Sequence, residues 1–182
     1  MTETTAASFV DLLRTQIRNE FTASQQYVAI AVWFDGADLP RLAARFYSQS
    51  VEERNHAMMM VRYMLDRGWE VHVPGIDDVR NEFGDPVEPI ALALAQERRV
   101  TEQCETLFRA ARDARDVLSE QFMLWFLKEQ VEEVASMNSL RTIADRAGSD
   151  WFQIEEHLAR EAAGNASDNS APEVAGGALT SA

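Results

Sequence analysis

Apolar side chains recur at alternating steps of four and three along most of this chain, which is the spacing of one face of an α-helix. In the first such stretch they fall at Leu13, Ile17, Tyr27, Ala31 and Phe34. The pattern predicts helices over about residues 8–35, 38–67 and 85–114, a fourth that ends at Gly148, and a short fifth over about 151–162. The chain is therefore expected to be all-α.

Capping residues mark the starts of these helices. Ser8 with Asp11 three residues later is typical of a helix N-terminus, and Asp38 with Pro40 is expected to open the second helix. A capping box with proline in the first turn is expected at Asp85, Pro86, Val87 and Glu88.

A long connection separates the second and third helices. Gly68 is suited to ending the second helix, and residues 69–85 contain prolines and glycines with no lasting periodicity. A connection of this length lets the chain return along the bundle, so the second and third helices are expected to run parallel. The pattern predicts a four-helix bundle with one long crossover plus a short fifth C-terminal helix.

Polar residues interrupt the apolar stripe near the middle of each long helix. The interruptions are Glu20, then Glu53 with His56, then Glu97, and finally Gln130 with Glu133. Glu53 and His56 are three residues apart, so they lie on one helix face about one turn from each other. In a bundle the four interruptions are expected to meet at one level.

A buried metal pair would explain these interruptions. Carboxylates in a low-dielectric interior are costly to desolvate and repel one another, and a divalent metal relieves both costs. Oxygen-rich ligands with a single imidazole favour iron or manganese over a structural zinc. A lone Glu on such a stripe is commonly a flanking position, but matching depth on four helices favours the metal. Tyr27, one heptad after Glu20, fits either a core position or a role beside the metals.

Composition and charge narrow the range of partners. The 182 residues carry a net charge of −13 at pH 7, which argues against nucleic acid or an anionic membrane and favours cations. The single cysteine, Cys104, excludes an internal disulfide. The N-terminus lacks the features of a signal peptide, and no stretch reaches the roughly 20 apolar residues of a membrane span. We therefore expect a cytoplasmic protein.

Four motifs, one from each long helix, carry a family resemblance that covers about residues 8–162. They are Asn19 to Tyr27 (NEFTASQQY), Glu52 to Ala57 (EERNHA), Gln96-Glu97, and Trp125 to Glu133 (WFLKEQVEE). Together they resemble the prokaryotic non-haem ferritins of the actinobacterial kind. The resemblance implies a ferritin-like di-iron domain over residues 1–162 that acts as a ferroxidase. It would oxidise Fe²⁺ with oxygen and store Fe³⁺ as a mineral in a hollow cage, for iron storage and detoxification.

The resemblance also implies roles for individual residues. A first iron would be held by Glu20, Glu53 and His56. A second iron would share Glu53 and bind Glu97, with Gln130 beside the pair. A neighbouring third iron site would use Glu52, Glu129, Glu132 and Glu133.

Departures from related families refine these expectations. Other di-iron carboxylate bundles carry a second Glu-x-x-His on the fourth helix, where this chain has Gln130 to Glu133 without histidine. Arg54 occupies the place of the methionine that ligates haem in bacterioferritins, so we expect no haem.

The resemblance implies a homo-oligomer of 24 subunits. Three acidic residues before and within the fourth helix either line a pore for iron or form a solvated helix start: Asp113, Asp116 and Glu120.

Residues 163–182 are rich in Gly, Ala, Ser and Asn without periodicity, which predicts a disordered C-terminal tail. Such a tail would serve as a spacer or as a signal that docks to a larger shell.

Two other classes of function remain open at this point. One is a di-iron or dimanganese oxidase acting on an organic substrate, although the residues flanking the polar level are large: Tyr27, Met60, Met123 and Phe126. The other is a structural bundle without metal, in which Glu53→Ala or Glu97→Ala would raise stability by removing a buried charge.

Overall fold

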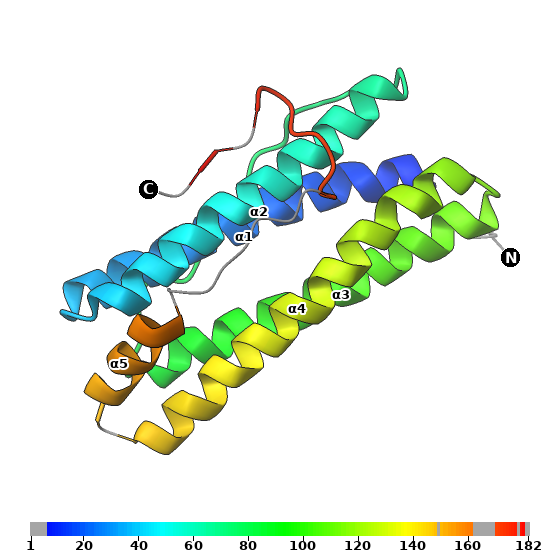
Figure 1. Cartoon of the computed structure of the whole chain (residues 1–182). Coiled ribbons are helices and arrows are strands. Elements are labelled where there is room, and N and C mark those ends of the chain that lie inside the picture. The colour runs from blue at the N-terminus through cyan, green and yellow to red at the C-terminus, as the bar shows by residue number, and fades with distance from the viewer. Residues whose placement is uncertain (1–6, 149, 162–169, 178, 181–182) are drawn as a thin grey trace, which may run out of the picture.

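The computed structural model describes residues 7–148, 150–161, 170–177 and 179–180 of the chain. Within these ranges there are five α-helices and no strand (Figure 1): α1 (Phe9–Gly36), α2 (Pro40–Asp66), α3 (Val87–Asp113), α4 (Val117–Ala147) and α5 (Phe152–Glu161). Helix boundaries lie within two residues of those predicted. The prediction of an all-α fold is confirmed.

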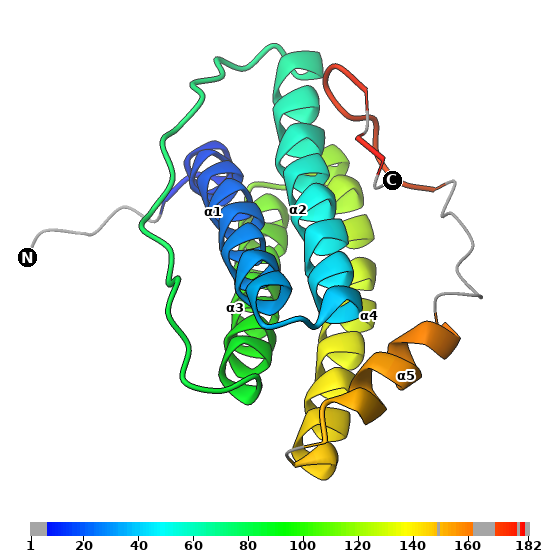
Figure 2. The same ribbon diagram turned by 90° about the vertical axis from the view of Figure 1, so that its left-hand side faces the viewer.

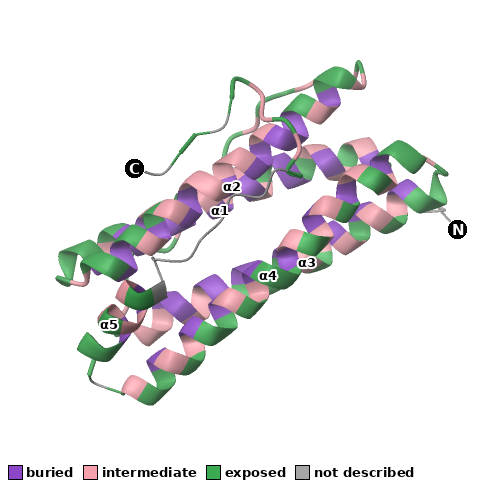
Figure 3. Cartoon of the chain, in the orientation of Figure 1, coloured by how far each residue is buried: buried purple, intermediate pink, exposed green. Residues whose placement is uncertain are grey.

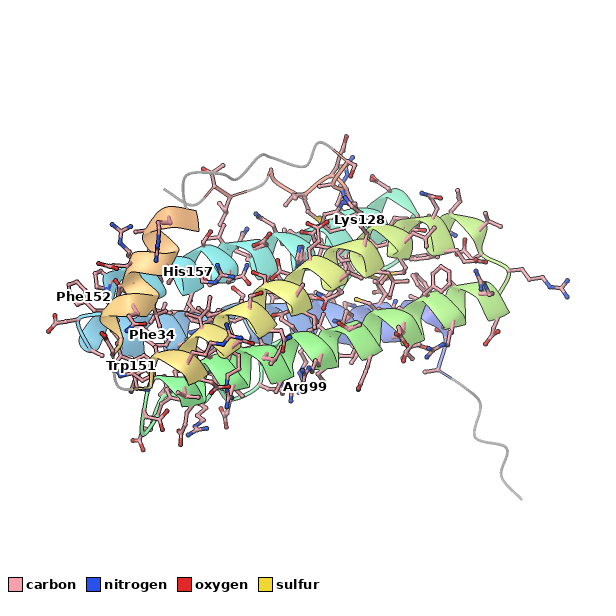
Figure 4. The ribbon with its side chains drawn as sticks, turned by 60° about the horizontal axis from the view of Figure 1, so that its bottom comes forward. Phe34, Arg99, Lys128, Trp151, Phe152 and His157 are labelled. Atoms are coloured by element: carbon pink, nitrogen blue, oxygen red, sulfur yellow. The ribbon has the colours of Figure 1, made fainter. Side chains whose placement is uncertain are left out.

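The four long helices form two antiparallel pairs. α1 packs against α2, α3 packs against α4, and α1 also contacts α3. The crossover after α2 returns along one side of the bundle, so α2 and α3 point the same way, as predicted (Figures 1 and 2). The short α5 contacts α2 and α4 at one end of the bundle. There Trp151 packs on the apolar cluster that contains Phe34 (Figure 4).

The interior is divided into three zones along the bundle axis. Each long helix carries buried residues along much of its length (Figure 3). One apolar cluster, with Phe34 and Leu140, lies toward α5, and a second, with Leu13 and Met123, lies toward the other end. Burying a large apolar side chain contributes about 1.5–3 kcal/mol, so these clusters offset the cost of polar groups between them. Along the helices, the stretches between the two clusters hold the buried polar residues Glu20, Glu53, His56, Glu97 and Gln130.

The starts of α1 and α2 are capped in different ways. Ser8 caps α1 as predicted. Asp38 does not cap α2, because its backbone turns with a φ of 56° before the helix begins. Instead, the Glu155 carboxylate of α5 accepts hydrogen bonds of 2.9 Å from the backbone N–H groups of Arg41 and Leu42. The acceptor needed by the first turn of α2 therefore comes from a distant helix.

The capping box predicted before α3 is half present. Asp85 Oδ1 accepts hydrogen bonds from the backbone N–H groups of Val87 at 2.8 Å and Glu88 at 3.1 Å. The Glu88 carboxylate does not return to Asp85 and accepts from the backbone N–H of Gly84 instead, at 3.1 Å.

The crossover is fastened along one face of α1. Arg18 forms an ion pair with Asp77, whose backbone N–H donates to Thr22 Oγ1 at 3.2 Å. Gln26 exchanges two hydrogen bonds of 2.8 Å with the backbone of Arg80. Because positions four apart share a helix face, these contacts hold the crossover beside the outer side of α1.

The predicted disordered tail falls partly outside the described residues, at 163–169, 178 and 181–182. Its described part lies beside α2: the Asn55 side chain exchanges two hydrogen bonds of 3.0 Å with the backbone of Leu179. The backbone N–H of Ala175 donates to the carbonyl oxygen of Met58 at 3.3 Å. In Figure 2 the tail and the crossover lie on opposite sides of the bundle.

None of the helices in the described part of the chain combines the length and apolar character needed to cross a membrane.

Candidate metal centre

Three of the predicted ligands come together in the middle of the bundle. Glu20 of α1 meets Glu53 and His56 of α2, and each offers a ligand atom within 4.8 Å of the others. We call this group the deep cluster. All three side chains are buried, with Glu20 fully enclosed. His56 Nδ1 lies 3.4 Å from Glu53 Oε2, as their spacing of one helical turn requires.

Glu97 faces the deep cluster from α3. Its carboxylate is buried. Its charge, like that of Glu20, adds to the effect of burial in raising the pKa of Glu53. The Tyr27 hydroxyl donates a hydrogen bond to Glu97 Oε1, so Tyr27 stands beside this carboxylate. Gln130 of α4 lies near Glu97 and accepts a 3.0 Å hydrogen bond from Thr101 Oγ1.

Three buried carboxylates each keep one oxygen without a hydrogen-bond partner among the described residues. These atoms are Oε2 of Glu20, Oε2 of Glu97 and Oε2 of Glu133. Leaving such an atom unpaired in the interior costs free energy, which a cation would recover. Carboxylate oxygens with one imidazole are the ligands that a hard or borderline divalent metal prefers. The donor set therefore fits the predicted metal.

The burial of these carboxylates changes their acidity. Burial, helped by the charges of Glu97 and Glu20, raises the pKa of Glu53 well above its ordinary value. Burial also raises the pKa of Glu97 to about 7 and that of Glu133 to about 8. Without a cation, these groups therefore hold protons near neutral pH, and a bound metal must displace those protons.

A second acidic cluster lies beside the first, between α2 and α4. Glu52, Glu129 and Glu133 offer oxygens within 4.8 Å of one another. We call this group the shallow cluster, because Glu52 and Glu129 are only partly buried. Gln49 Nε2 donates a 2.7 Å hydrogen bond to Glu52 Oε2. Glu132, which the family resemblance places at the same site, is exposed and is not part of either cluster in the described structure.

The pattern did not assign a role to several polar residues that hold the ligands. Gln16 donates to Glu20, Gln49 to Glu52 and Thr101 to Gln130. Gln16 lies four residues before Glu20 and Gln49 three before Glu52, so helical spacing from a ligand was the available signal.

Two of the acidic residues near the start of α4 have local partners. Asp116 caps α4 through Ser119 and forms a 2.9 Å ion pair with Arg67. Glu120 lies 3.3 Å from Arg112. A pore requires several subunits, so the role of Asp113, Asp116 and Glu120 in a pore stays a prediction.

Known proteins resemble this chain along most of its length. Residues 10–147 match the family model described as a ferritin-like domain. Ferritin BfrB of Mycolicibacterium smegmatis is 63% identical over 171 residues, with 94% of each chain covered. Ferritin BfrB of Mycobacterium tuberculosis is 57% identical over 171 residues, with the same coverage. The crystal structure of an open-pore ferritin from Archaeoglobus fulgidus aligns with a TM-score of 0.80 at 26% identity, covering 82% of this chain and 93% of that one.

Proposed function

The chain belongs to the ferritin family and stores iron, and we propose that it fills this store by oxidising Fe²⁺ with oxygen at the deep cluster and Glu97. The supporting observation is the set of buried carboxylate oxygens that have no partner, Oε2 of Glu20 and Oε2 of Glu97 above all. They lie at the level where Glu53 and His56 complete an oxygen-rich site with a single imidazole.

The chemistry of the site favours oxidation of iron. Anionic oxygen ligands stabilise Fe³⁺ more than Fe²⁺, so electron loss becomes easier inside the cluster. Two Fe²⁺ ions held together would give one electron each to dioxygen, which takes up two protons and becomes hydrogen peroxide. The protons on Glu53 and Glu97 leave as Fe²⁺ binds, since a carboxylate binds metal only when ionised. Tyr27 holds one oxygen of Glu97, which leaves the other for iron.

Iron then has to leave the site for the mineral. We assign the shallow cluster as a third iron site, because Glu133 is near both Glu97 and Glu52, whose charges raise its pKa along with burial. Gln130 is a weak ligand, being uncharged and with its amide oxygen bonded to Thr101. Weak ligation beside the pair lets ferric product move on, as a store requires.

The assembly is part of the proposal. We propose a homo-oligomeric cage of 24 subunits that contains iron and no haem and works in the cytoplasm. The tail after residue 162 would be a spacer or dock to a larger shell. An organic substrate fits less well, because Tyr27, Met60, Met123 and Phe126 are each no more than 2% exposed.

Size and iron uptake test the proposal together. Purified protein is passed over a sizing column with light scattering, before and after Fe²⁺ is added in air, while ferric absorbance is followed. A particle of about 490 kDa, which is twenty-four times 20.5 kDa, is expected. It should take up far more iron than its ligand clusters hold. A small oligomer that stops taking up iron once those clusters are full would contradict storage by this chain and indicate a di-metal oxidase.

A further inference from the structure

A groove in the bundle is lined in part by a residue that is hydrogen-bonded to the deep cluster. It lies between α1 and α3, has a volume of about 320 Å³, and is lined by Gln16 and Asn19 of α1 and by Arg99 and Gln103 of α3, among others. Figure 4 shows Arg99 on the α3 side of the molecule. Gln16 is only 2% exposed, so its side chain forms part of the floor of this groove.

Two amides connect the groove to a metal ligand. Gln16 Nε2 donates a 2.8 Å hydrogen bond to Glu20 Oε1. Asn19 Nδ2 in turn donates a 3.1 Å hydrogen bond to Gln16 Oε1. Both bonds join residues of α1 that are three or four positions apart, so they form within a single subunit. Oε2 of Glu20 has no partner among the described residues.

Chemistry fixes the direction of both hydrogen bonds. A carboxylate that binds a metal carries no proton and can only accept, so in that state the Gln16 nitrogen must face Glu20 and its oxygen must face away. Asn19 satisfies that oxygen with its own nitrogen. If residue 19 were an acceptor, it would compete for the Gln16 nitrogen and turn the Gln16 oxygen toward Glu20.

We propose that Gln16 and Asn19 are positioning residues that hold Glu20 with one oxygen bonded to protein and the other turned to metal. The pair thereby restricts Glu20 to a single coordinating oxygen, which sets both the affinity of the site and the number of oxygens around the metal. This inference rests on the proposed oxidation site, since it concerns the same Glu20. If the Gln16 amide had only a structural role, removing it would not change the coordination of a metal bound to Glu20.

The test uses Co²⁺, whose visible absorption reports coordination number without any oxidation. Gln16→Leu removes the donor to Glu20 and leaves an apolar side chain of similar bulk. Asn19→Asp preserves the shape but replaces the donor to Gln16 with an acceptor. Gln103→Leu is the matched control, because Gln103 lines the same groove and has no hydrogen bond to Glu20 among the described contacts. Helical content and particle size check that each variant folds and assembles.

The expected changes follow from the loss of a partner behind a ligand, which typically costs about 10–100-fold in metal affinity. Gln16→Leu should weaken Co²⁺ binding about tenfold or more and alter the visible spectrum, as Glu20 becomes free to bind through both oxygens. Asn19→Asp should weaken binding several-fold, although its added negative charge alone would strengthen it. Gln103→Leu should match the wild-type protein in both measurements.

The outcomes separate this inference from the proposed function. If the wild-type protein binds Co²⁺ but Gln16→Leu and Asn19→Asp leave affinity and spectrum unchanged, the positioning role is wrong and the oxidation site stands. An equal change in Gln103→Leu would also overturn it, because the effect would then belong to the groove in general. If the wild-type protein binds no Co²⁺ and Glu53→Gln leaves the rate of Fe²⁺ oxidation unchanged, the assignment of the oxidation site itself is wrong.

Discussion

Glu52 and Glu53 are neighbours on α2, yet they belong to different environments. Glu53 is 1% exposed and lies in the deep cluster, and Glu52 is partly buried in the shallow cluster. Successive residues on a helix point about a quarter-turn apart, so one residue faces the bundle axis and the other faces the seam with α4. The same type of side chain therefore meets a different environment because of its place on the helix.

Under the proposed function, this difference gives the two clusters different tasks. In the deep cluster each carboxylate is buried and costly to leave unpaired, so a bound metal would be held strongly. In the shallow cluster water would compete for the partly buried Glu52 and Glu129, so a bound metal would exchange more readily. Glu133 links the two, since it is 7% exposed and interacts with both Glu52 and Glu97.

The largest expected effect comes from removing a deep ligand. Glu53→Gln keeps the size and burial of the side chain but removes the charge, so Fe²⁺ loses a central ligand. We expect the initial rate of Fe²⁺ oxidation to fall by more than about 100-fold, beyond what the loss of an outer-shell partner causes. The rate is measured from ferric absorbance after Fe²⁺ is mixed with aerated protein.

Glu52→Gln is the matched control, one residue away on the same helix. It should keep most of the initial rate, because its side chain lies outside the deep cluster. Equal losses in both variants would remove the distinction between the clusters. An unchanged rate in Glu53→Gln, with raised stability, would instead support the structural bundle without metal.

The second prediction concerns the stability of the metal-free protein. The pKa values of Glu97 and Glu133 rise from 4.5 to about 7 and about 8 on folding. The folded chain therefore binds more protons than the unfolded chain between pH 4.5 and about 8. This contribution to the free energy of unfolding is fully present below pH 4.5 and is lost as the pH rises through the folded pKa values.

Thermal unfolding of chelator-treated protein should show this dependence. The melting temperature is expected to fall by about 5 °C or more between pH 5 and pH 8, and added divalent metal should restore most of it at pH 8. Glu97→Gln isolates one group, because it cannot ionise and should lose less stability over the same range. A metal-free melting temperature that falls equally in Glu97→Gln and the wild-type protein would contradict the assignment to Glu97.

The buried polar residues in the middle of the bundle could be predicted from the sequence, because Glu20, Glu53 and Glu97 each interrupt an apolar helix face. A buried charge is costly, so its presence in such a stripe points to a function. Gln16 gave no such contradiction, since an amide is common on both buried and exposed faces. Its role follows only from the direction of its hydrogen bond to Glu20.

Contacts between distant elements were harder to predict. The cap on α2 comes from Glu155, more than a hundred residues away, and depends on how α5 docks. The contact between Asn55 and Leu179 likewise joins residues whose local composition indicates nothing about pairing. Helical periodicity determines which face of a helix is buried, but not which residue of another helix meets its end.

A third prediction concerns the shallow cluster alone. Combining Glu52→Gln with Glu129→Gln removes two of its three carboxylates, so the cluster should no longer retain a cation. Titration with Co²⁺ is expected to show one metal fewer per chain than in the wild-type protein, with the deep cluster still filled. If the same number of metals bound, the cluster would not be a metal site.

The smallest expected effect concerns Gln130, which lies beside Glu97. Gln130→Glu adds a charged ligand beside Glu97, so ferric product should be held more strongly and should pass to the mineral several-fold more slowly. The first turnover should stay close to the wild-type rate, because Glu20, Glu53, His56 and Glu97 are unchanged. The measurement follows oxidation during repeated additions of Fe²⁺, with Thr101→Val as a control that releases the Gln130 amide without adding charge. If Gln130→Glu recovered between additions as fast as the wild-type protein, weak ligation at this position would not be what frees the product.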